Sequence, residues 1–144
     1  NRAENRRRRK IAEKASRNSK PVQSLYPSPD RQQLLAAQLA LDHAMQHHSA
    51  GRLPQAERSY QQILQSDPNQ PVALHLLGVI AHQTGKAEVA VEFITKAVAI
   101  KPDFVEAYIV LGNAFQELGK LDQAISSYAK VLAMAPDYAE VHNN

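Results

Sequence analysis

Residues 74–102 read LHLLGVIAHQTGKAEVAVEFITKAVAIKP, and residues 108–136 follow the same pattern as YIVLGNAFQELGKLDQAISSYAKVLAMAP. The second stretch begins 34 residues after the first, and a third copy with fewer matches precedes both. The segments 37–70, 71–104 and 105–138 therefore align without a gap. A fixed period of this length predicts an array of similar structural repeats that stack on one another.

Each repeat is predicted to form two antiparallel helices. Apolar residues at helical spacing precede a glycine, which can adopt the left-handed conformation that ends a helix. A second helix follows and stops before a proline, because proline cannot continue a helix. A small residue in each helix lets the two helix axes approach closely. The four aligned columns are Ala44/Gly78/Gly112, Gly51/Gly85/Gly119, Ala56/Ala90/Ala124 and Pro68/Pro102/Pro136.

The same periodicity sets the expected helix boundaries. Asp30 followed by Gln33 has the spacing of a capping box and predicts a helix start at this point. Residues 18–29 contain three prolines and no helical period, which is typical of a linker. The predicted helices cover residues 31–49, 54–66, 71–84, 88–100, 105–118 and 121–134, with a short further segment from 138.

The residues that define the second repeat spell L-x-x-L-G-x-x-A, followed by G, A, I, A and P, and the third repeat matches this pattern. The pattern resembles the tetratricopeptide repeat (TPR) over residues 37–138. This resemblance implies an all-α fold, a right-handed superhelical solenoid of antiparallel helix hairpins, with about three repeats and the start of a fourth in residues 139–144. The matching residues are Leu74, Leu77, Gly78, Ala81, Gly85, Ala90, Ile94, Ala97 and Pro102.

The resemblance also implies a function. TPR proteins generally bind extended peptides or partner helices in a concave groove lined by the first helix of each repeat. We therefore expect a protein-interaction module or scaffold and not an enzyme, with no cofactor and no bound metal. By alignment, the expected groove residues are Leu41, Met45, His48, His75, Val79, His82, Ile109, Asn113 and Gln116.

Two kinds of TPR protein can be compared with these groove positions. Chaperone-tail receptors hold a C-terminal carboxylate with Lys, Arg and Asn, and this chain has none of those side chains at the matching positions. The arrays of O-linked N-acetylglucosamine transferases are similar in repeat length and style, so an alternative function is the substrate-presenting N-terminal region of a larger glycosyltransferase-type enzyme. Those arrays carry an asparagine ladder, whereas the corresponding residues in this chain are Asp42, Leu76 and Val110.

Composition and charge divide the chain into two parts. The 144 residues are 44% hydrophobic, which suits one modest globular domain. Residues 1–30 carry nine Lys/Arg and three acidic residues, a net charge of +6. Residues 31–144 carry eight Lys/Arg and eleven acidic residues, a net charge of −3. We expect a disordered basic arm and linker over 1–29 and a TPR domain over 30–144. A further alternative is an RNA-associated adaptor that binds through Arg6, Arg7, Arg8, Arg9 and Lys10.

Several other function classes are not expected. The sequence contains no cysteine, which excludes disulfides, thiolate metal sites and a cysteine nucleophile. No glycine-rich phosphate loop or nucleophile motif occurs, and Glu88 and Glu92 have the spacing of a solvated helix face. No apolar run approaches the roughly 20 residues of a membrane span, and we expect a cytoplasmic protein.

The histidines have a structural interpretation. His43 and His47 lie four residues apart, a spacing that suits two ligands of one metal ion, but they align with apolar core positions of the other repeats. We therefore expect both side chains to be partly buried in packing. His48 and His82 occupy the same position of successive repeats, and His75 lies two turns before His82 on the same helix face. The three could converge on the inner surface as a weak transition-metal site, although polar lining residues are the default interpretation.

The helix predicted over 121–134 carries Ile125, Tyr128 and Leu132 on one side. A complete fourth repeat would cover this side, and residues 139–144 supply only its beginning. We therefore expect self-association through this apolar end, within a fragment of a longer array.

Overall fold

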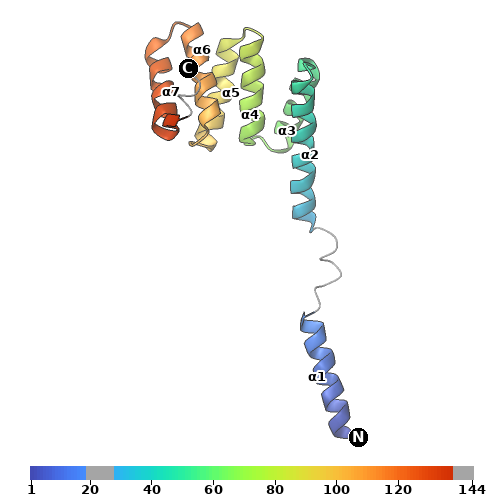
Figure 1. The fold of residues 1–144 in the computed structure, drawn as a ribbon. Helices are drawn as coiled ribbons and strands as arrows, with labels where there is room; N and C mark the ends of the chain where they lie inside the picture. The colour runs from blue at the N-terminus through green and yellow to red at the C-terminus, as the bar shows by residue number, and fades with distance from the viewer. Residues whose placement is uncertain (19–27, 138–144) are drawn as a thin grey trace. The chain divides into compact units, whose positions relative to one another are not determined.

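The computed structural model describes residues 1–18 and 28–137, and every regular element in these residues is a helix, as Figure 1 shows. The predicted all-α fold is confirmed. The chain divides into two compact units, Asn1–Gln38 and Leu39–Asn144, so the division lies within a helix and not at the expected residue 30. The helices are α1 (Arg2–Asn18), α2 (Pro29–Ser49), α3 (Leu53–Ser66), α4 (Pro71–Gln83), α5 (Ala87–Ile100), α6 (Val105–Glu117) and α7 (Leu121–Met134).

The basic arm forms helix α1, where the composition had led us to expect disorder. Its Arg, Lys, Ala and Glu residues all favour helices, and Glu4 in the first turn complements the helix dipole. The Asn1 side chain accepts a hydrogen bond from the Ala3 N–H at 3.0 Å and caps the first turn. Side chains 1–14 are all exposed, which includes the whole run from Arg6 to Lys10. Local propensity and capping are therefore the features that favour this helix.

Helix α2 begins two residues earlier than predicted. The Arg31 N–H donates to Ser28 Oγ at 3.2 Å, and Pro29 occupies the first helical position, where its missing N–H costs nothing. This serine cap takes the place of the capping box that we expected at Asp30 and Gln33. The remaining linker positions, 19–27, lie outside the described residues, as does the predicted segment from 138.

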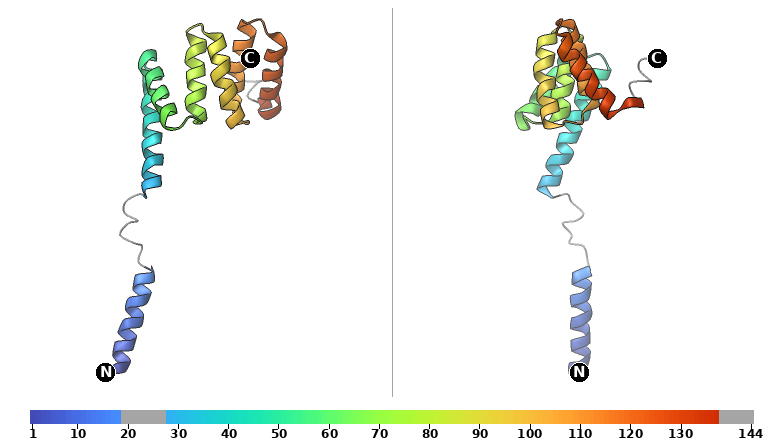
Figure 2. Two further views of the ribbon diagram at one scale, coloured as in Figure 1. Left: turned by 180° about the vertical axis from the view of Figure 1, so that it is seen from behind. Right: turned by 90° about the vertical axis from the view of Figure 1, so that its left-hand side faces the viewer.

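In the second unit, the predicted helix boundaries agree with the structure to within one residue for α3 to α7. Figure 2 shows the helices following one another as hairpins. Each hairpin turn contains a glycine with positive φ, namely 79° at Gly51, 80° at Gly85 and 72° at Gly119, a conformation that strains other residues. The turns close with the same hydrogen bond in each repeat, from the N–H groups of Arg52, Lys86 and Lys120 to the carbonyls of His47, Ala81 and Phe115 at 2.9, 2.7 and 2.9 Å.

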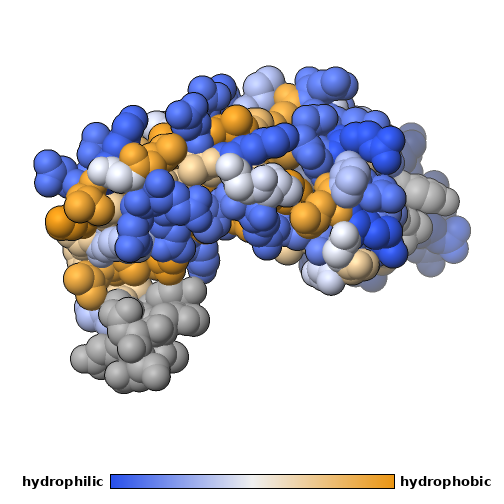
Figure 3. Space-filling view, turned by 90° about the horizontal axis from the view of Figure 1, so that it is seen from above, coloured by the Kyte–Doolittle hydropathy of each residue, from blue (hydrophilic) through white to orange (hydrophobic). Residues whose placement is uncertain are grey.

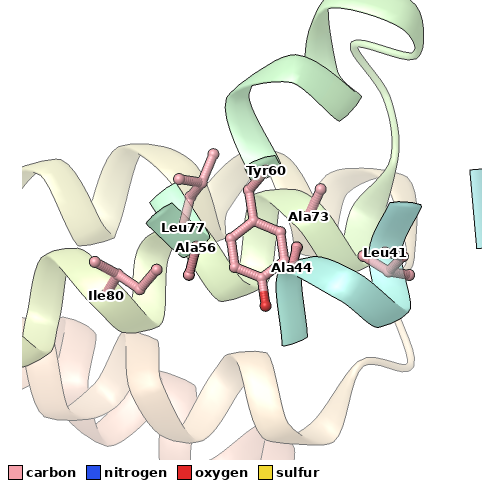
Figure 4. Packing of buried hydrophobic residues seen from close by; sticks show 7 residues of the cluster. All are labelled: Leu41, Ala44, Ala56, Tyr60, Ala73, Leu77 and Ile80. Atoms are coloured by element: carbon pink, nitrogen blue, oxygen red, sulfur yellow. The ribbon is translucent and has the colours of Figure 1, made fainter. Parts of the chain in front are cut away.

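The buried core is shared between consecutive repeats. One cluster joins the first hairpin, α2 and α3, to the first helix of the next hairpin, α4 (Figure 4). A second cluster joins α5 to the following hairpin, α6 and α7, in the same manner. A single hairpin therefore buries its apolar face only with its neighbour. The first cluster consists of Leu41, Ala44, Ala56, Tyr60, Ala73, Leu77 and Ile80.

His43 does not pack as expected, whereas His47 is partly buried as predicted. His43 is exposed, and His47 is half-buried with its Nδ1 accepting a hydrogen bond from Arg52 Nε at 3.0 Å. Leu77, which occupies the repeat position of His43, packs against the preceding hairpin. No hairpin precedes α2 in the second unit, so the side chain at position 43 has no such surface to pack on.

The most exposed large apolar side chains of helix α7 are Leu121, Ile125 and Leu132, with exposures of 60%, 65% and 53%. In Figure 3, apolar side chains gather at this end of the repeats. The equivalent residues of α5 are Ala87, Val91 and Val98, and these pack into clusters that include α6. The face of α7 that carries Leu121, Ile125 and Leu132 is therefore one on which the first helix of another repeat could pack. Self-association through this face stays a prediction.

Replacing Gly78 or Gly112 with alanine should affect stability to different extents, because the neighbours of the added methyl group differ. A Cβ added at Gly78 would overlap Ile94 Cγ1, and Ile94 is fully buried. At Gly112 it would come within 2.6 Å of Tyr128 Cε1, near the end of a half-buried ring. The first hairpin already combines an alanine with a tyrosine at these two positions, as Ala44 and Tyr60.

We expect Gly78→Ala to lower the free energy of unfolding by about 1–2 kcal/mol, because an overpacking cost of roughly 1–3 kcal/mol exceeds a helix-propensity gain of about 1 kcal/mol. For Gly112→Ala we expect a change within about 0.5 kcal/mol, because the tyrosine ring can shift. Urea denaturation followed by circular dichroism measures both. Equal losses in the two variants would show that the two contacts are equally rigid.

His75 on α4 is a buried polar residue at the boundary between two repeats. Its side chain is 7% exposed, and its ring centroid lies 4.6 Å from that of Phe104. Nδ1 has no hydrogen-bond partner. Burial lowers the pKa of His75 from 6.5 to about 4; the charge of Glu106 opposes this shift and that of His48 adds to it. The folded chain therefore holds this imidazole in its neutral form at pH 7.

This burial predicts a loss of stability in acid. Between pH 6.5 and pH 4 the unfolded chain binds a proton at position 75 that the folded chain excludes, so the free energy of unfolding falls as the pH drops through this window. The expected loss from pH 7 to pH 5 is about 2 kcal/mol. Leucine already occupies the equivalent position of the preceding repeat, as Leu41. The variant His75→Leu should therefore lose the part of the pH dependence of the unfolding free energy that comes from the imidazole. If urea denaturation shows the same difference between pH 7 and pH 5 in both proteins, the buried imidazole is not the cause.

Candidate functional site

The first helices of the three hairpins, α2 from Leu39, α4 and α6, each present one row of the predicted groove residues. Within each helix these residues are spaced by four and then three positions, so they share one helix face. The 34-residue repeat brings the three rows into corresponding positions. We call this set the first-helix surface; its members are Leu41, Met45, His48, His75, Val79, His82, Ile109, Asn113 and Gln116.

The nine residues differ in accessibility. Leu41 and His75 are buried, at 6% and 7% exposure, so they belong to the core beneath the surface and offer a partner little contact area. Met45 is 42% exposed and Gln116 is exposed as well. The other five are half-buried, and two of them, Val79 and Ile109, are apolar. The accessible part of the surface therefore combines apolar side chains with polar neighbours.

Polar side chains bridge consecutive first helices in a repeated register. His48 Nε2 on α2 lies 3.0 Å from Gln83 Oε1 on α4, a hydrogen-bonded pair. His82 Nε2 on α4 lies 2.9 Å from Glu117 Oε1 on α6, although this contact lacks hydrogen-bond geometry. In both pairs the partner follows the histidine by 35 residues, which is one repeat plus one position. These contacts restrict the side chains at one end of the surface.

The tyrosines of the second helices behave differently in the first and third hairpins. The Tyr128 hydroxyl donates to Asn113 Oδ1 and approaches Gln116 Oε1 at 3.3 Å. The equivalent Tyr60 hydroxyl has no hydrogen-bond partner. Met45, a weak thioether acceptor, stands at the position of Asn113, and His48, at the position of Gln116, pairs its Nε2 with Gln83. The His48 ring stands edge-on to the Tyr60 ring, 6.3 Å between centroids. Burial raises the pKa of Tyr60 to about 12, so the hydroxyl keeps its proton and remains a donor.

Lys and Arg are absent from the first helices, whereas acidic residues occur on first and second helices alike. Leu39–Ser49, α4 and α6 contain no Lys or Arg, and their acids are Asp42, Glu106 and Glu117. Glu106 and Glu117 are both exposed and lie on α6. All basic residues between 39 and 137 lie on second helices or in the segments that connect helices, namely Arg52, Arg58, Lys86, Lys96, Lys101, Lys120 and Lys130.

The three histidines that could have converged contact separate partners. His48 pairs with Gln83, His75 stacks on Phe104 and His82 approaches Glu117. Across residues 1–18 and 28–137, no group of three or more metal-ligating side chains comes together. The carboxylates of Glu88 and Glu92 are exposed on α5, as expected for a solvated face. These arrangements suit packing and polar recognition.

Two other features lie beside the first-helix surface or apart from it. An open depression on α2 is lined by Asp42, Met45, Gln46, Ser49 and Ala50 and adjoins the surface at Met45. The basic side chains from Arg6 to Lys10 are exposed on α1, in the first unit. Among the helices of the described residues, none combines the length and apolar character that crossing a bilayer requires.

The contacts of Gln83 and Glu117 with the two histidines were not predicted from the sequence. Their signal is a polar residue that follows a histidine by one repeat plus one position, and it occurs twice in the chain. The unpaired hydroxyl of Tyr60 was also missed. Comparison of Met45 with Asn113 across the repeats would have indicated it, since a thioether cannot replace the amide oxygen as an acceptor.

Comparison with known proteins agrees with this architecture. Two family models described as tetratricopeptide repeat match the chain, one over residues 34–103 and the other over residues 81–143. Among curated protein sequences, none matches significantly.

Solved structures share the fold. The first TPR of Spaghetti (RPAP3), bound to the HSP90 peptide SRMEEVD, is 26% identical with a TM-score of 0.67, over 70% of this chain and 80% of that one. MamA is 22% identical with a TM-score of 0.66, over 69% of this chain and 58% of that one. A mutant of the O-GlcNAc transferase of Thermobaculum terrenum is 28% identical with a TM-score of 0.71, over 78% of this chain but only 21% of that one. With repeats, helix hairpins and family matches in agreement from residue 34 to 143, the chain belongs to the tetratricopeptide repeat family.

Proposed function

We propose that this chain is a non-enzymatic protein-interaction module that binds a polypeptide partner on its first-helix surface. The observation that carries the proposal is the combination of accessible apolar side chains, Met45, Val79 and Ile109, with unpaired or bridging polar groups on the same three helices. Such a mixture suits an extended peptide, whose side chains fill apolar positions while its backbone requires hydrogen-bond partners. The similar TPR of Spaghetti, bound to an HSP90 peptide, supports this mode of use.

The chemistry of the surface differs from that of a receptor for acidic tails. The peptide bound by the Spaghetti repeats, SRMEEVD, ends in acidic residues. The basic residues that TPR chaperone-tail receptors use to hold such a terminus are missing from this chain. The matching positions hold Leu41, Met45, His75, Glu106 and Val110.

The proposal is tested by removing the apolar contacts without adding charge. Peptides are selected from a random library on the full chain, and their affinities are measured by fluorescence anisotropy. We expect Val79→Gln combined with Ile109→Gln to weaken binding at least about tenfold, because two partly buried apolar contacts are lost.

The matched control is Val89→Gln combined with Ile100→Gln. These residues are the same two types, 37% and 41% exposed on α5, outside the first-helix surface. The control should bind like the parent, and circular dichroism melts of both variants report folding. If the control loses as much affinity as the test variant, or neither loses any, the binding surface lies elsewhere.

A second function is favoured by one comparison. The match to the Thermobaculum terrenum O-GlcNAc transferase spans 78% of this chain and about a fifth of the longer one, at 28% identity. The chain could thus be the substrate-presenting repeat region of a larger glycosyltransferase. Asp42, Leu76 and Val110 replace the asparagine ladder, so substrates would be held differently. The test is transfer of N-acetylglucosamine by the complete gene product to peptides selected on this surface.

A further inference from the structure

The distribution of charge on the first helices indicates what kind of polypeptide fits them. Over Leu39–Ser49, α4 and α6 the formal charge is negative, since these helices hold three acids and no Lys or Arg. Every basic residue from 39 to 137 lies on a second helix or a connecting segment. Two of the basic side chains are placed over aromatic rings, Lys101 over Phe104 and Lys130 over Tyr108. The first helices therefore supply no Lys or Arg to their carboxylates, and the basic side chain that approaches Glu117 is the imidazole of His82.

The two acids of α6 lie at the ends of one row. Glu106 and Glu117 are eleven residues apart, which returns to nearly the same side of an α-helix after three turns. Ile109 and Asn113 lie between them on the same side. At 1.5 Å per residue the row is about 16 Å long, and an extended peptide covers that length in about five residues. The row thus has a carboxylate at each end and an isoleucine and an asparagine between them. The distance between the two carboxylates matches the length of about five residues of an extended peptide.

A buried polar group lies within electrostatic reach of one end of this row. The His75 side chain is only 7% exposed, and its Nδ1 has no hydrogen-bond partner. The ring interacts electrostatically with Glu106 and His48. Its burial keeps the ring neutral at pH 7, so His75 adds no positive charge that would repel a cation near Glu106. Native structures leave few buried polar groups unpaired, and the Tyr60 hydroxyl on the neighbouring hairpin is a second one.

We propose that the first-helix surface selects polypeptides carrying Lys or Arg on both sides of a short apolar stretch, and that it discriminates against acidic ones. This inference rests on the proposed function and specifies its partner. Glu106 and Glu117 receive the two basic side chains, while Val79 and Ile109 contact the apolar residues between them. A separation of about five residues between the two basic positions matches the length of the row.

The test starts from the library selection on the full chain, from which only peptides that lose affinity in the Val79→Gln, Ile109→Gln variant are kept. This filter removes acidic peptides that bind the basic helix α1. Each remaining peptide is compared with a copy in which Lys and Arg are replaced by Gln. We expect the basic peptide to bind about five- to tenfold more tightly, as two exposed ion pairs allow, and the preference to shrink with added salt.

The same pair of peptides is then measured on charge variants of the protein. Glu106→Gln combined with Glu117→Gln should abolish the preference for the basic peptide and leave binding of the Gln copy unchanged. The matched control, Glu88→Gln with Glu92→Gln, removes the same charge from exposed positions of α5 and should retain the preference.

The possible results separate the two proposals. If the surface-dependent peptides are acidic or neutral, the charge selection is wrong while the proposed function stands. The charge selection is equally overturned if the α5 control loses the preference to the same extent, since a general electrostatic field would then be responsible. If no peptide depends on Val79 and Ile109, the proposed function itself fails, and the inference fails with it.

Discussion

The contact on which the rest of the fold depends is that between a small residue of each first helix and a large side chain of the second. Ala44 meets Tyr60, Gly78 meets Ile94 and Gly112 meets Tyr128, and a carbon added to either glycine would require its large neighbour to move. This proximity allows the two helices of a hairpin to pack closely, and it sets the side of the first helix that turns inward. The adjacent row of Met45, Val79 and Asn113, about 100° further around each first helix, keeps some accessible surface for other contacts.

Because each hairpin buries its apolar face against its neighbour, the energetics of the second unit follow the order of the repeats. Interior positions such as Ala87 and Leu77 are buried, whereas their equivalents Leu121 and His43 are exposed. The difference comes from the neighbouring hairpin and not from the residue's own helix. A polar residue at position 43 is therefore tolerated, while the same change at Leu77 would place a polar group in a closed core.

The repeat period was sufficient to predict the second unit, because helix ends depend on local features that recur in the sequence. Glycines with positive φ and prolines after the second helices are such features, and the helix boundaries from α3 to α7 followed from them to within one residue. Contacts between repeats were not predictable in this manner. The pairing of His48 with Gln83 depends on how two helices are placed, and the burial of Leu41 and His75 depends on the neighbouring hairpin. Helix α1 was missed because its high charge was weighed above its helix propensity.

The columns that build the fold and the positions that we propose to contact a partner are largely different residues, so the same fold can present different surface chemistries. Met45, Val79 and Asn113 occupy one repeat position with three chemistries, and only the last is tied to the core through the Tyr128 hydroxyl. His75 is the exception, because it is both buried in a repeat boundary and close to Glu106 on the partner-facing row. Burial of its neutral ring costs stability in acid, a cost that Leu41 avoids at the equivalent position. The imidazole therefore lowers the stability of this repeat boundary in acid and leaves a buried nitrogen unpaired, two costs that an apolar residue such as leucine would not carry.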